Sequence, residues 1–126
     1  MVAIKVYEKF KMNKDPHKFK NIRKEINIMN NLKHEGVLRL IESVETLTKI
    51  SLVVEYGGEQ SLLEFIKRQF PLKVAQIRDI ATQLIKALCY LHSKSIVHRD
   101  IKLQNILIRE GKITLIDFGF GCLSTA

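Results

Sequence analysis

The sequence contains no apolar run that approaches the roughly 20 residues a membrane-spanning helix requires. Its first residues, Met1, Val2 and Ala3, lack the charged-then-apolar layout of a secretory signal peptide. Internal repeats and low-complexity segments are also missing. These absences exclude a membrane span and favour a globular protein inside the cell, in the cytoplasm or nucleus.

Cysteine is scarce, with two residues, Cys89 and Cys122. Their spacing fits neither a metal-binding pattern nor a disulfide framework. We therefore expect free thiols in a reducing compartment. Cys89 falls within a helical pattern, and we expect it in the core.

Acidic residues are outnumbered, 13 Asp and Glu against 21 Lys and Arg, which gives a net charge of +8. Most of the excess lies in residues 1–39. A basic surface can attract nucleic acid, anionic lipid or a phosphorylated partner. No aromatic-interleaved RNA motif or DNA-reading helix accompanies the charge. A solvated helix face is the favoured interpretation, and no nucleic-acid partner is expected.

The first half of the chain predicts a small sheet and one helix. With 126 residues, of which 46% are hydrophobic, the chain can form a single core. β-branched runs predict strands over residues 2–7, 37–42 and 50–55, the last two as an antiparallel pair. Polar residues 9–16 predict a loop. Apolar residues three and four apart predict an amphipathic helix over residues 17–32.

The second half predicts two helices. Gly57 and Gly58 follow a strand directly and indicate a flexible link. Residues 61–68 predict a short helix, in which Ser61 is the cap and Glu64 stands at capping-box spacing. Residues 72–94 predict a long buried helix. Its apolar face would comprise Ile77, Ile80, Ala81, Leu84, Ala87, Leu88 and Leu91.

Near the end of the chain, apolar residues 105–109 and 112–116 flank Glu110-Gly111 and predict a β-hairpin. In-register pairing would bring Asn105 and Asp117 together, each with an acceptor oxygen for a hard cation. Asp100 lies five residues before Asn105 and would face the same pocket.

Three motifs carry a family resemblance. Residues 98–105 have the sequence HRDIKLQN, residues 117–119 are DFG, and residues 2–5 are VAIK. This set resembles the protein kinase catalytic core, with its catalytic loop, metal-binding D-F-G and third-strand lysine. Linked motifs at this spacing are far more specific than any one alone.

The resemblance implies an α+β, two-lobed kinase-like fold that is present in part. Residues 1–126 would form a partial kinase domain, truncated at both ends. Residues 1–55 would be a small antiparallel-sheet lobe without its first strands, comprising the third strand, helix C and two further strands. Residues 56–126 would be the hinge and the start of the helical lobe, up to D-F-G.

The implied activity is ATP-dependent phosphoryl transfer to serine or threonine hydroxyls of a protein substrate. Asp100 would accept the proton of the substrate hydroxyl, while Asn105 and Asp117 would hold Mg²⁺. Lys102 would contact the transferred phosphate as a third catalytic-loop residue. A lysine at this place is typical of serine/threonine kinases and disfavours a tyrosine-specific enzyme.

Lys5 and Glu25 are the implied ion pair of the nucleotide site. By resemblance, Lys5 pairs the α and β phosphates of ATP and an acidic residue on the next helix. Glu25 matches that acidic residue. On its pattern alone, Glu25 could equally be a surface carboxylate in an i, i+4 charge network.

The adenine contacts are also implied by resemblance. The small Ala3 would lie against adenine, and Leu107 is counted with the cofactor-binding residues. The backbone carbonyl of Glu55 and the amide of Gly57 would bind the adenine edge. Val54 would be a small gatekeeper that leaves the rear pocket open.

Two functions remain open for this sequence. One is the ATP- and Mg²⁺-binding centre of a serine/threonine kinase, similar to calcium/calmodulin-dependent and AMP-activated types, with little activity as a fragment. The other is a non-catalytic kinase-like module that binds a nucleotide or a partner. The expected partners are a protein substrate and a regulatory protein.

Overall fold

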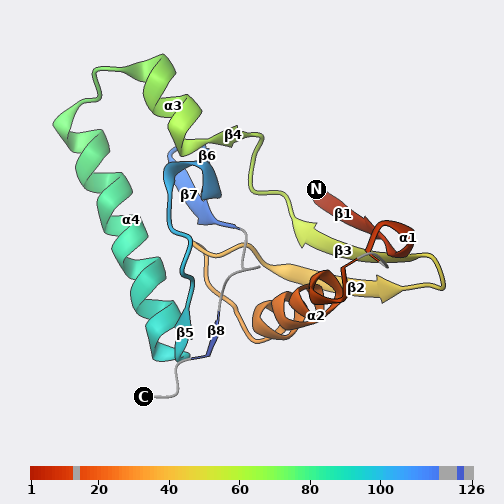
Figure 1. Cartoon of the computed structure of the whole chain (residues 1–126). Coiled ribbons are helices and arrows are strands. Elements are labelled where there is room, and N and C mark those ends of the chain that lie inside the picture. Colours follow the sequence, from red (N-terminus) through yellow and green to blue (C-terminus); the bar gives the residue numbers. More distant parts are fainter. Residues whose placement is uncertain (13–14, 117–121, 124–126) are drawn as a thin grey trace.

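The computed structural model describes residues 1–12, 15–116 and 122–123, which form two groups of elements (Figure 1). The first is an antiparallel sheet in the order β1-β3-β2, with a helix on one face. Its elements are β1 (Val2–Glu8), α1 (Lys9–Met12), α2 (Pro16–Asn30), β2 (Leu40–Glu45) and β3 (Lys49–Glu55).

The second group combines two helices with short strands (Figure 1). One sheet has the order β4-β6-β7, and β5 pairs with β8 in another. The elements are β4 (Gln60–Ser61), α3 (Leu62–Gln69), α4 (Val74–Ser93), β5 (Ile96–Val97), the 3₁₀ turn Leu103–Asn105, β6 (Ile106–Arg109), β7 (Lys112–Leu115) and β8 (Cys122–Leu123).

The core of the first group lies between one face of the sheet and helix α2. In β3, the buried Ile50, Leu52 and Val54 alternate with less buried residues, as a strand with one covered face requires. These side chains share a core cluster with Ile22 and Met29 of α2. The predicted helix and the antiparallel pairing of the two later strands are confirmed.

The predicted loop over residues 9–16 is wrong in part, because Lys9–Met12 forms α1. Tertiary contacts explain the difference. The Lys9 amide donates to the carbonyl of Thr48 at 2.8 Å, and Met12 is 4% exposed within the core. Asp15 then caps α2 by accepting a hydrogen bond from the His17 amide at 3.0 Å.

The segment between α2 and β2 connects the two groups. The Leu115 amide donates to Gly36 at 2.8 Å, and the Leu38 amide donates to Leu115 at 3.0 Å. Residues 37 and 38 are thereby paired with β7. This is why β2 begins at Leu40 and not at residue 37 as predicted. A Cβ atom on Gly36 would lie 3.0 Å from the Cβ of Ala87 in α4, so a larger residue fits here only if its neighbours shift.

The predicted hairpin is confirmed. β6 and β7 pair in register from Ile106 opposite Leu115, and the turn residues Glu110 and Gly111 have φ values of 51° and 78°. Positive φ at both central residues is typical of a two-residue hairpin turn. The Ile116 amide donates to the carbonyl of Asn105 at 3.0 Å, which extends the pairing by one step.

The short helix α3 is as predicted, with Ser61 accepting a hydrogen bond from the Glu64 amide at 3.2 Å. The prediction of a buried α4 is only half right. Ala87 and Leu91 are fully buried, whereas Ile77 near the other end of the helix is 52% exposed. Among the described residues, β5 and β7 supply the main packing against α4.

Cys89 is exposed, so its predicted place in the core is wrong. It lies two residues from both Ala87 and Leu91, and residues two apart do not share a helix face. No helix in the described ranges combines the length and apolarity needed to cross a membrane.

Candidate active site

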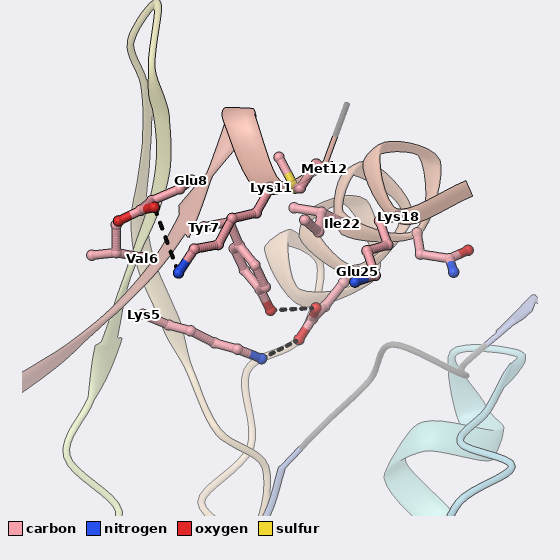
Figure 2. Close-up of a pocket in the computed structure, with 10 residues that line it drawn as sticks. Lys5, Val6, Tyr7, Glu8, Lys11, Met12, Lys18, Ile22 and Glu25 are labelled. Carbon is pink, nitrogen blue, oxygen red and sulfur yellow. Dashed lines mark hydrogen bonds and ion pairs between the residues drawn. The ribbon is translucent and has the colours of Figure 1, made fainter. Parts of the chain in front are cut away.

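Lys5 and Glu25 face each other across the gap between β1 and α2. The Lys5 Nζ lies 3.9 Å from Glu25 Oε1, with the lysine side chain 52% exposed and the glutamate side chain 8% exposed. Figure 2 shows both side chains converging from their two elements. The alternative of Glu25 as a surface carboxylate is therefore wrong. Its place on α2 beside Ile22 and Met29 puts it on the buried helix face.

The residues predicted to bind the cofactor line one cavity of about 320 Å³, within the size range of small-molecule sites. The cavity lies between the two groups of elements. All seven are present, namely Ala3, Lys5, Glu25, Val54, Glu55, Gly57 and Leu107. The sequence analysis missed six further lining residues, Met29, Leu38, Leu52, Tyr56, Gly58 and Ile116. Met29, Leu38, Leu52 and Ile116 resemble ordinary core residues in the sequence, whereas Gly58 belongs to the predicted flexible link after the strand and could have been included.

The link after β3 shapes one wall of this cavity. A Cβ atom on Gly57 would lie 3.2 Å from Leu107 Cδ1 and 3.6 Å from Leu38 Cδ1, so the glycine leaves space that a side chain would fill. The Glu55 amide already donates to the carbonyl of Arg39 at 3.0 Å. On this side the wall of the cavity is formed by Gly57 together with the apolar side chains of Leu38 and Leu107.

Tyr56 of the same link contacts Arg109, the last residue of β6. The guanidinium of Arg109 lies 5.0 Å from the centre of the Tyr56 ring, within the range of a cation–π contact. Partial desolvation, followed by a hydrogen bond to Glu59 and its negative charge, raises the pKa of the Tyr56 phenol. The Tyr56 phenol consequently keeps its proton, which it shares with Glu59.

The predicted catalytic residues also come together. Asn105 Nδ2 donates to Asp100 Oδ2 at 2.8 Å and to the Asp100 carbonyl at 3.0 Å. The Lys102 Nζ lies 3.8 Å from Asp100 Oδ1. The Asp100 carboxylate thus has one oxygen held by Asn105 and the other beside the lysine. Asn105 is 7% exposed, so its side chain is fixed by its surroundings.

His98 connects the loop that carries Asp100 to Ile116, the residue after β7. It is 3% exposed, and its Nε2 lies 2.8 Å from the carbonyl of Ile116. Its Nδ1 accepts a hydrogen bond from the Asp100 amide at 3.1 Å. Because Nδ1 accepts, a neutral ring must carry its proton on Nε2. The next residue, Arg99, has φ of 65°, a conformation that non-glycine residues rarely adopt.

Asp117, the other predicted metal ligand, lies outside the described residues. Asn105 uses its amide nitrogen as a donor to Asp100, which leaves its Oδ1 as an oxygen of the kind Mg²⁺ prefers. Within residues 1–12 and 15–116, no three or more His, Cys, Asp or Glu side chains form a group that could hold a metal. The metal assignment stays a prediction.

Comparison with known proteins identifies the class. The protein kinase domain family matches residues 1–126. The chain is 38% identical over 125 residues to the probable serine/threonine-protein kinase MARK-A of Dictyostelium discoideum, covering 98% of this chain and 12% of that protein. It is 41% identical over 121 residues to the serine/threonine-protein kinase TIO of Arabidopsis thaliana, covering 94% of this chain and 9% of that protein.

A third relative is the human NUAK family SNF1-like kinase 2, which is 37% identical over 124 residues, with 98% of this chain and 20% of that protein covered. The chain therefore spans between 9% and 20% of the length of these relatives. This chain belongs to the protein kinase family, and its 126 residues form part of a kinase domain with an α+β fold. The predicted resemblance to serine/threonine kinases is confirmed.

Proposed function

We propose that this chain carries the nucleotide-binding and catalytic residues of a serine/threonine kinase, which transfers the γ-phosphoryl group of ATP to a hydroxyl of a protein substrate. One residue carries the proposal. Ile116 lines the nucleotide cavity, donates its amide to Asn105 and accepts a hydrogen bond from His98. The cavity and the catalytic loop, residues 98–105, are therefore connected through Ile116.

In this proposal Asp100 orients the attacking hydroxyl and accepts its proton. Asn105 fixes one carboxylate oxygen, so the other faces the reacting groups near Lys102. Lys102 and Lys5 place positive charge where the phosphates carry negative charge. The arrangement acts by positioning and electrostatics, which supply most of the catalysis in phosphoryl transfer.

The residues present also fit the two cofactors. The apolar walls at Ala3, Val54 and Leu107 fit an adenine ring, and the Glu55 carbonyl and Gly57 amide would bind its edge. Bound Mg²⁺ would neutralise phosphate charge, with Asn105 Oδ1 and Asp117 as its protein ligands.

The proposal extends to the division of the chain. Residues 1–55 would be part of the amino-terminal lobe, and residues 56–126 the hinge and part of the helical lobe. An intracellular location, in the cytoplasm or nucleus, and a regulatory protein partner belong to the same proposal.

The test is a transfer assay on the full-length protein that contains these residues. Labelled ATP and Mg²⁺ are supplied with matched peptides that differ only in a serine, threonine or tyrosine acceptor. We expect label on the serine and threonine peptides, with at least a hundredfold loss in Asp100→Asn. ATP binding without any transfer would instead support the non-catalytic module.

A further inference from the structure

A second cavity, of about 510 Å³, lies beside the Lys5–Glu25 pair, and Tyr7 forms part of its wall. Residues of strand β1 and helices α1 and α2 line it, and Lys5 and Glu25 line both this cavity and the nucleotide cavity. Figure 2 shows the Tyr7 ring reaching from β1 towards Glu25. A contact to Glu25 from the second cavity therefore also affects the Lys5–Glu25 pair that lines the nucleotide cavity.

Tyr7 contacts both members of the pair. Its hydroxyl donates to Glu25 Oε2 at 3.5 Å, while the Lys5 Nζ lies 3.9 Å from Glu25 Oε1. The Lys5 Nζ also lies 5.0 Å from the centre of the Tyr7 ring, in cation–π range. One oxygen of the Glu25 carboxylate thus contacts the Tyr7 phenol and the other lies beside the Lys5 ammonium group.

Strand geometry explains how two residues of β1 reach the same carboxylate. Side chains two apart on a strand share a face, so Lys5 and Tyr7 point to α2 while Val6 points away and is 49% exposed. The VAIK motif in the sequence predicted a site role for Lys5. It gave no signal for Tyr7, whose position is that of an ordinary core residue.

Burial explains why a second partner matters. Glu25 is 6% exposed, and a buried carboxylate is costly unless both of its oxygens are paired. The Lys5 side chain is 52% exposed, and half-exposed ion pairs at such a distance contribute little. The Tyr7 hydroxyl gives Glu25 Oε2 a hydrogen-bond partner, while Lys5 lies beside Oε1.

We propose that Tyr7 is a positioning residue, which holds Glu25 towards β1 and thereby sets Lys5 for the phosphates of the nucleotide. This inference rests on the proposed kinase function. In physical terms, Tyr7 raises the fraction of molecules in which the Lys5–Glu25 pair is formed before the nucleotide binds. The apparent affinity for a ligand that needs this arrangement scales with that fraction.

The main experiment compares Tyr7→Phe with the wild type in the full-length protein. This change removes only the hydroxyl and keeps the ring that packs on the core. We expect the KM for ATP to rise about 3- to 10-fold, the range for one hydrogen bond. The value of kcat at saturating ATP should stay within about twofold, because bound ATP restores the paired state. An unchanged KM would overturn the proposal.

A matched control removes a hydroxyl elsewhere. Tyr90 lies on α4 and lines neither cavity. Its hydroxyl accepts a hydrogen bond from the Lys33 amide at 2.7 Å. Tyr90→Phe should lower the melting temperature and leave the KM for ATP unchanged. Equal rises in KM for Tyr7→Phe and Tyr90→Phe would show a merely structural effect and overturn the proposal.

A double-mutant cycle tests whether Tyr7 acts through Glu25. In a Glu25→Leu background, which leaves no side-chain oxygen to accept the Tyr7 hydroxyl, Tyr7→Phe should raise the KM for ATP by less than about twofold. A full 3- to 10-fold rise in that background would show an independent effect and contradict the proposal.

Hydrogen exchange separates this inference from the proposed activity. Tyr7→Phe should speed amide exchange in α2 about 3- to 10-fold, whereas Tyr90→Phe should not. If the wild-type protein transfers no phosphate, the kinase proposal fails, and this measurement still decides the role of Tyr7. Unchanged exchange in α2 would count against it.

Discussion

Asn105 donates a hydrogen bond from its side-chain amide to the Asp100 carboxylate at 2.8 Å. This contact connects the proposed base, Asp100, with the proposed metal ligand, Asn105. The donor nitrogen holds the proposed base in place. The remaining oxygen of the same amide is then available for a cation. Because Asn105 is 7% exposed, it has little freedom to choose another orientation.

Replacing Asp100 with asparagine should slow phosphoryl transfer strongly and leave ATP binding nearly unchanged. The proposed role of Asp100 is to orient a hydroxyl and take its proton, and removal of such a base commonly costs a factor of about 10²–10⁴. Single-turnover transfer should fall by that amount, while calorimetry should find ATP affinity within about twofold of wild type. The exposed Glu110→Gln in the hairpin turn is the control. A large loss of ATP affinity would reassign Asp100 to nucleotide binding.

Asp117→Ala should remove the magnesium-dependent part of ATP affinity. A carboxylate that shares the metal with Asn105 would couple metal and nucleotide binding. Calorimetry on wild type should show tighter ATP binding with Mg²⁺ than without it, and the variant should show no difference. If ATP binds the wild type equally well with and without Mg²⁺, binding depends on adenine contacts alone.

The sequence predicted best the features that depend on local chemistry. Glu110-Gly111 predicted the hairpin because few residues adopt positive φ at both turn positions. Ser61 predicted the start of α3, since a hydroxyl can satisfy a free amide at a helix end. Motif resemblance added the pairing of Lys5 with Glu25, which periodicity alone left open.

Features that depend on distant partners were missed. Met12 becomes part of the core only because β1 and α2 enclose it, so α1 looked like a polar loop. Val37 pairs with β7, far along the chain, and this moved the start of β2. Tyr7 and Gln83 belong to no motif. Tyr7 contacts Glu25, 18 positions away, and Gln83 of α4 contacts Gly111, 28 positions away.

Gly36→Ala should destabilise the protein, because its Cβ would lie 3.0 Å from the Cβ of Ala87 in a segment pinned by hydrogen bonds. Overpacking of this kind costs about 1–3 kcal/mol, visible as a lower midpoint of denaturant unfolding. The same change in an Ala87→Gly background should cost less, because the opposing methyl group is gone. Equal costs in both backgrounds would show that steric contact is not the cause.

Gln83 of α4 clamps the hairpin turn. Its Nε2 donates to the Gly111 carbonyl at 2.8 Å, and its Oε1 accepts from the amide of the buried Ile113 at 3.0 Å. Gln83→Ala leaves both backbone groups without this partner and should cost about 1–3 kcal/mol of unfolding free energy. Gln69→Ala, at the exposed end of α3, should cost less than about 0.5 kcal/mol. A similar cost for both variants would refute the clamp.

The polypeptide of residues 1–126, expressed alone, should be marginally stable and transfer little phosphate. Helix α4 leads into the catalytic loop, yet Val74, Ile77 and Ile85 on it are 71%, 52% and 60% exposed. A few hundred Å² of uncovered apolar surface forgoes several kcal/mol at about 25 cal/mol per Å², comparable with the roughly 5–15 kcal/mol stability of a whole domain.

Positioning is most of what a kinase supplies, so a marginally stable polypeptide that unfolds often should act slowly even with every catalytic residue present. The measurements are a thermal melt and a γ-phosphate transfer assay on this polypeptide. Ile77→Lys with Ile85→Lys should reduce its aggregation, because both side chains already face water. A cooperative melt together with turnover near the 1–100 s⁻¹ typical of kinases would contradict the prediction.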